Sequence, residues 1–115
     1  MNALAARAEG DPEKPCVVLL HGFMGSKADW TEIQQALATS FFTLAVDLPG
    51  HGESPIGDDA SFATAAAAVV ELVDDRDIAT FAVIGYSMGA RLALYFASHY
   101  SMRVDAAVIE GGSPG

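Results

Sequence analysis

A serine between two glycines is the residue of this chain best suited to covalent or proton-transfer chemistry. Gly85-Tyr86-Ser87-Met88-Gly89 has the spacing glycine, any residue, serine, any residue, glycine. Such a turn would present the Ser87 hydroxyl at the amino end of a helix, where the dipole and free amides favour a negatively charged oxygen. The pattern alone more often marks an ordinary glycine-flanked turn. A strand expected before it and a helix expected after it favour Ser87 as a catalytic residue.

Two backbone amides would complete a site around this serine. The amide of Met88 directly follows Ser87, and His21-Gly22-Phe23-Met24-Gly25 follows an earlier apolar run. In this context the Phe23 amide is the second expected donor to an oxyanion. His21 is expected to shape its loop by hydrogen bonding rather than to act as a general base.

Arg91 lies four residues after Ser87, so a regular helix places both on the same side, one turn apart. A guanidinium at this place would recognise a carboxylate on a substrate. The alternative is a surface ion pair on the helix, and the spacing favours neither reading over the other. His99 is three turns further along and is expected to lie far from Ser87.

Four strands and three helices are predicted to position these residues. The strands cover 16–20, 42–46, 81–84 and 104–109, and the helices cover 27–38, 61–73 and 88–100. In the first helix, Trp30, Ile33, Leu37 and Ala38 recur at helical spacing and predict its apolar face. The alternation predicts an α/β fold, a three-layer αβα sandwich with a mostly parallel sheet. Ligands bind at the carboxyl ends of such strands, so the loops after the four strands should share one rim.

Composition limits the possible partners. The chain has 115 residues, 51% of them hydrophobic, and a net charge of -9. We expect residues 1–115 to be part of one domain that binds neither nucleic acid nor anionic membranes. No apolar run approaches the roughly 20 residues of a membrane span, and residues 1–10 lack the features of a secretory signal, so we expect a cytoplasmic protein. The single cysteine, Cys16, is expected to fill the core, and no metal or organic cofactor is indicated.

Three strings resemble the α/β-hydrolase superfamily in order and spacing, over residues 14–109. They are His21-Gly22-Phe23-Met24-Gly25, Asp47-Leu48-Pro49-Gly50-His51-Gly52-Glu53-Ser54 and Gly85-Tyr86-Ser87-Met88-Gly89. Within it, residues 85–91 and 110–115 are similar to the 2-succinyl-6-hydroxy-2,4-cyclohexadiene-1-carboxylate synthase family of menaquinone biosynthesis.

The narrower resemblance implies a lyase in which a Ser-His-Asp triad removes a proton from the substrate and pyruvate is eliminated. By this resemblance Ser87 is the base, and the amides of Phe23 and Met88 form the oxyanion hole. Tyr86 and Arg91 would line the pocket of a small, carboxylate-rich substrate. Members carry the triad acid, the triad histidine and a helical cap beyond the part matched here. The resemblance therefore implies the N-terminal half of the domain, inactive or nearly so alone.

Three functions remain open from the sequence. The first is the pyruvate-eliminating lyase. The second is an esterase, thioesterase or carbon-carbon-bond hydrolase, which would use the same Ser87 and oxyanion hole. The third is a non-catalytic binding domain or a half-enzyme, which would associate through the sheet edge left exposed by the strand at 104–109.

Overall fold

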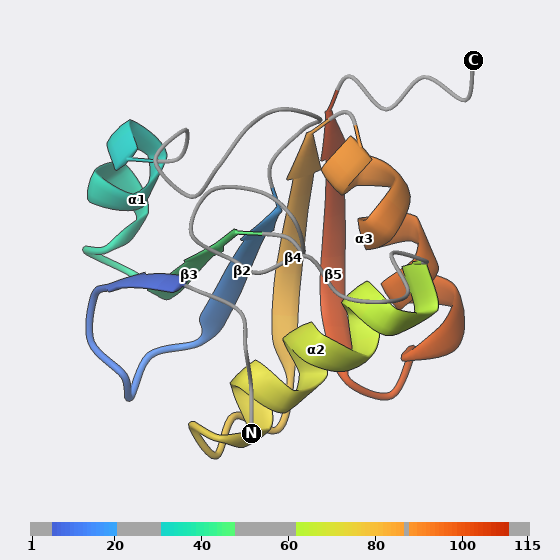
Figure 1. The fold of residues 1–115 in the computed structure, drawn as a ribbon. Coiled ribbons are helices and arrows are strands. Elements are labelled where there is room, and N and C mark those ends of the chain that lie inside the picture. Colours follow the sequence, from blue (N-terminus) through green and yellow to red (C-terminus); the bar gives the residue numbers. More distant parts are fainter. Residues whose placement is uncertain (1–5, 21–30, 48–61, 87, 111–115) are drawn as a thin grey trace.

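The described residues form a five-stranded sheet and three helices (Figure 1). The computed structural model describes residues 6–20, 31–47, 62–86 and 88–110. In chain order the elements are β1 (Ala6–Glu9), β2 (Cys16–Leu20), α1 (Thr31–Leu37), β3 (Phe42–Val46), α2 (Phe62–Asp74), β4 (Phe81–Tyr86), α3 (Met88–His99) and β5 (Val104–Glu110).

The sheet has the strand order β1-β3-β2-β4-β5 and is mostly parallel. β2 pairs in parallel with β3 and with β4, and β4 pairs in parallel with β5. All five residues of β2 are buried, as its continuous apolar run predicts for a central strand of a parallel sheet. The predicted bounds of β2 and β3 are confirmed, and the expected α/β class with a mostly parallel sheet is confirmed with them.

β1 is a strand that the sequence analysis missed. It pairs antiparallel with β3 at one edge of the sheet, with Glu9 opposite Thr43. Its sequence Ala-Arg-Ala-Glu has low strand propensity, and charged residues are typical of exposed edge strands rather than of apolar runs. The strand is followed by Gly10, whose φ is +102° and where a Cβ would collide with the carbonyl oxygen of Phe41. Only glycine meets both conditions without strain.

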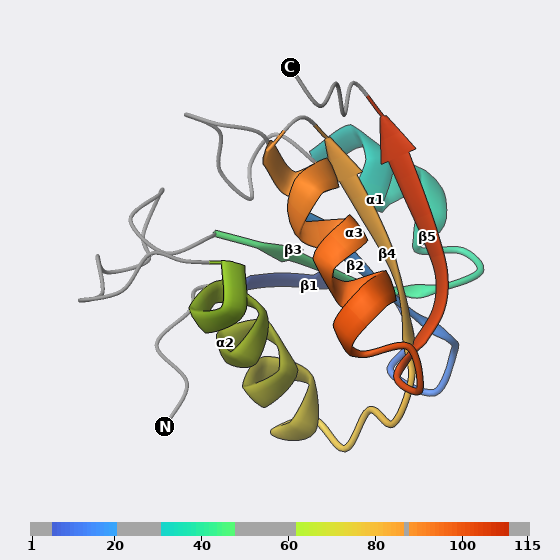
Figure 2. The ribbon, with the colours of Figure 1, turned by 90° about the vertical axis from the view of Figure 1, so that its right-hand side faces the viewer.

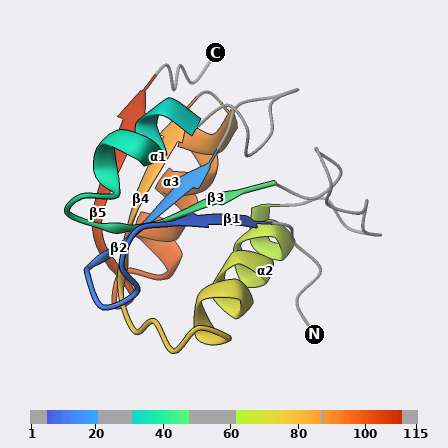
Figure 3. The same ribbon diagram turned by 90° about the vertical axis from the view of Figure 1, so that its left-hand side faces the viewer.

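Helices cover both faces of the sheet, so the expected three layers are confirmed. Figure 2 shows α2 and α3 in front of the sheet with α1 behind it, and Figure 3 shows the opposite side. Among the described residues, the face under α2 and α3 carries a cluster of sixteen buried apolar residues, including Phe81, Leu92 and Phe96. On the α1 face the corresponding cluster is Val17, Leu19 and Ala45.

The buried face of α1 differs from the prediction. Ile33 was expected inside and is 43% exposed, whereas Gln34 has no exposed surface. The reason is β1, since the Gln34 amide donates to a carbonyl oxygen of this unexpected strand. A buried amide with partners on the sheet replaces the apolar residue that periodicity alone would place there.

β5 forms the other edge of the sheet and is poorly covered. Opposite the step from Phe81 to Ala82, the register jumps from Val104 to Ala106, which leaves Asp105 as the extra residue of a bulge. Val108 and Ile109 are 53% and 38% exposed. Among the described helices, none has the length and hydropathy of a segment that crosses a bilayer.

Candidate active site

The four parallel strands end on the same side of the sheet, as their arrowheads show in Figure 1. The last residue of β2, Leu20, pairs with Val46 at the end of β3 and with Gly85 near the end of β4. Tyr86 pairs with Glu110, so β4 and β5 end together. The strand ends that carry the predicted rim therefore lie together at one edge of the sheet.

The junction between β4 and α3 has the strand-to-helix order that the glycine pattern predicts. The strand ends at Tyr86 and the helix begins at Met88, so a single residue, Ser87, separates them. Gly85 and Gly89, on either side, are both buried. The expected strand and helix are thus confirmed, and residues 85–89 do not lie within one unbroken element. Ser87 itself lies outside the described residues.

The amino end of α3 lies at this rim, because the helix begins one residue after β4 ends. The first four N–H groups of a helix have no partner inside it, and they include the amide of Met88, the first helical residue. Leu92, Ala93 and Phe96 hold the helix against the sheet with 1% or less exposure. The first turn is therefore fixed by packing further along the helix. Phe23, the other expected donor, falls outside the described residues, as does His21.

Tyr86 and Arg91, expected to bind substrate, lie on the accessible side of this junction. Tyr86 is 52% exposed at the end of β4. Arg91 is exposed on the first turns of α3, on the same outward side as Leu94, and it already has an interaction partner. Both the carboxylate-binding role and the surface ion pair remain compatible with this placement.

Asp47 lies at the end of β3, and the sequence analysis named it only as part of a motif shared with the α/β-hydrolase superfamily. It follows Val46 directly, has no exposed surface and is engaged in an interaction. Burying a carboxylate is costly unless it is hydrogen-bonded or paired, so Asp47 has a structural or functional task at this place. The sequence signal that could have identified Asp47 is its position directly after the apolar run that forms a fully buried strand.

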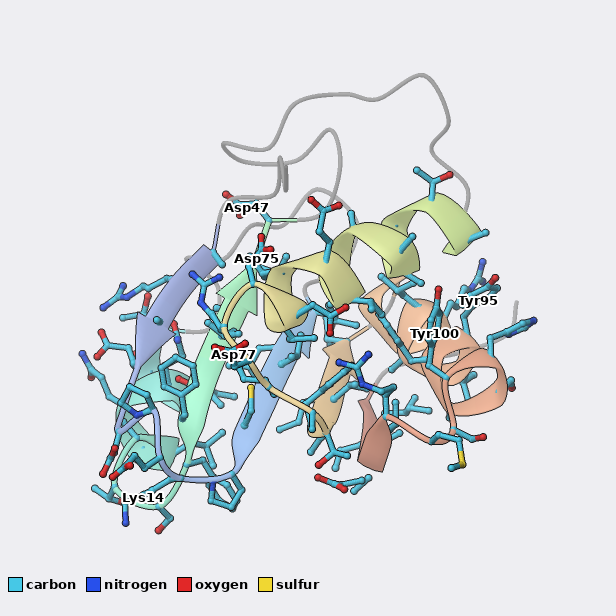
Figure 4. The ribbon with its side chains drawn as sticks, turned by 90° about the horizontal axis from the view of Figure 1, so that it is seen from below. Lys14, Asp47, Asp75, Asp77, Tyr95 and Tyr100 are labelled. Carbon is cyan, nitrogen blue, oxygen red and sulfur yellow. The ribbon has the colours of Figure 1, made fainter. Side chains whose placement is uncertain are left out.

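Two hollows among the described residues lie at the opposite end of the sheet. They have volumes of about 660 and 420 Å³ and share the loop from Asp77 to Thr80, which precedes β4. Lys14 and Asp77, which both line the smaller one, are labelled in Figure 4, a view from this end. Neither hollow belongs to the rim.

Arg103 lines the larger hollow and hydrogen-bonds to the loop after α2. Its Nη2 lies 2.6 Å from Asp74 Oδ1 and donates to the carbonyl oxygen of Ile78 at 3.0 Å, while its Nε donates to the carbonyl oxygen of Ala79. The guanidinium is thus used to hold the loop that leads into β4. In the part of the chain that the structure describes, no cluster of three or more His, Cys, Asp or Glu side chains is placed to hold a metal ion.

Comparisons with known proteins agree with this geometry. Residues 15–115 match the family model described as the alpha/beta hydrolase fold. The 2-succinyl-6-hydroxy-2,4-cyclohexadiene-1-carboxylate synthase of Serratia proteamaculans (strain 568) is 34% identical over 116 residues, covering 100% of this chain and 45% of that protein. The synthase of Escherichia coli O1:K1 is 35% identical over 111 residues, covering 96% of this chain and 44% of that protein. The chain thus spans less than half the length of these relatives.

A solved structure shares the fold. That of a marine microorganism esterase superposes with a TM-score of 0.88 at 28% identity, over 95% of this chain and 41% of that one. The resemblance to the synthases is confirmed at the level of sequence similarity. With a family model matching all but the first residues, and with the sheet, the rim and the strand-to-helix turn as described, the chain belongs to the α/β-hydrolase fold family.

Proposed function

We propose that this protein is a serine-dependent lyase that eliminates pyruvate to form 2-succinyl-6-hydroxy-2,4-cyclohexadiene-1-carboxylate. The observation that carries the serine chemistry is the one-residue junction between β4 and α3 at the rim of the sheet. The names of the related synthases supply the product, and the elimination of pyruvate is what the resemblance to that family implies. The cytoplasmic location expected from the sequence stays a prediction.

Each site residue has a distinct role in this proposal. The Ser87 oxygen removes a proton from the substrate once its own proton has been taken by a histidine. The amides of Phe23 and Met88 stabilise the negative charge that develops on a substrate oxygen. Arg91 binds a substrate carboxylate through charge-assisted hydrogen bonds, and Tyr86 lines the same side of the pocket.

The required histidine is not His99. Its imidazole stacks on the ring of Tyr95 with 3.9 Å between ring centroids, and its Nδ1 lies 3.1 Å from the Tyr95 carbonyl oxygen. His99 stands twelve positions after Ser87 in the sequence, which corresponds to about 18 Å along a regular helix. The general base therefore comes from a histidine outside the described residues.

The second candidate is a hydrolase acting on an ester or thioester. The similarity to the marine esterase favours it, and the same serine and amides would serve its tetrahedral intermediate. Arg91 separates the two candidates, because a guanidinium is useful for a multiply anionic substrate and has no task toward a neutral ester.

The test compares two substrates on the full-length protein. The precursor that still carries the pyruvate unit is assayed by coupled pyruvate detection, and an uncharged p-nitrophenyl ester by absorbance. We expect pyruvate release, and Ser87→Ala should lower kcat at least about a thousandfold. Arg91→Met should raise KM for the precursor about tenfold, the value of one charge-assisted hydrogen bond, without changing ester KM.

The control is Arg76→Met, which removes an exposed cation at the end of α2, away from the rim. It should leave both reactions unchanged. Rapid ester turnover without pyruvate release would favour the hydrolase, and full activity of Ser87→Ala in both assays would exclude both serine mechanisms.

A further inference from the structure

We draw no further inference here: the strongest candidate, the apolar surface that Val108 and Ile109 form on β5 at the edge of the sheet, carries no proposal because nothing in the described part of the structure shows what covers it.

Discussion

The Cys16 thiol should make the stability of the protein depend on pH in the alkaline range. Cys16 is 6% exposed in β2, and burial raises the pKa of its thiol from 9.0 to about 12, although the Arg76 guanidinium acts in the opposite direction. Between these values the unfolded chain loses a proton that the native protein retains. The contribution of the protonated Cys16 thiol to the free energy of unfolding is complete below pH 9. As the pH rises above 9, this contribution falls by about 1.4 kcal/mol per pH unit.

The measurement is urea unfolding followed by circular dichroism, from pH 8 to pH 11, for the full-length wild type and Cys16→Ala. The variant lacks the thiol, and its cavity lowers stability by an amount that does not depend on pH. The difference in unfolding free energy between the two proteins should therefore change by about 2.7 kcal/mol over this range, in favour of the variant at high pH. All other titrating groups cancel in that difference. Parallel curves for the two proteins would refute the reasoning.

Three further substitutions, and one control, test the packing, the loop and the sheet edge. Phe96→Ala removes a ring that has no exposed surface and whose centroid lies 5.8 Å from that of the Phe81 ring. It should lower the free energy of unfolding in urea by about 3–5 kcal/mol. Leu94→Ala, on the half-exposed side of α3, should lower it by less than about 1 kcal/mol. Arg103→Met should cost about 1–2 kcal/mol in the same assay, since it removes the carbonyl contacts and the partly exposed ion pair. Val108 is 53% exposed on the β5 edge, so Val108→Lys should weaken association through this edge and lower the mass measured by light scattering at high concentration. A wild-type protein that stays monomeric at every concentration would contradict this.

The sequence predicted the central strands well because they are buried on both faces. The apolar runs at 16–20 and 42–46 correspond residue for residue to β2 and β3. β1 could not be found in this way, since an edge strand needs no apolar run and is defined by pairing with β3, a contact distant in sequence. The reversed burial of Ile33 and Gln34 follows from the same omission, because the partner of the Gln34 amide lies on β1.

For the candidate site, the sequence predicted the strands and helices better than the contacts between side chains. The glycine pattern and the flanking elements predicted the junction between β4 and α3. The alternation of strands and helices predicted that the carboxyl ends of the parallel strands share one edge of the sheet. The hydrogen bonds of Arg7 with Thr31 and of Gln34 with Thr43 were not foreseeable, since they join three elements that meet only in the folded protein. The positions of Ser87 and Phe23 themselves remain predictions.

The unequal burial on the two faces of the sheet has a consequence for the temperature response. Among the described residues, sixteen form the apolar cluster under α2 and α3, and three form that of the α1 face. Amide protons of α1 should therefore exchange with deuterium through local fluctuations, whereas those of β2 and β4 should require global unfolding. Warming should therefore speed amide exchange in α1 before the cooperative melting transition of the sheet begins.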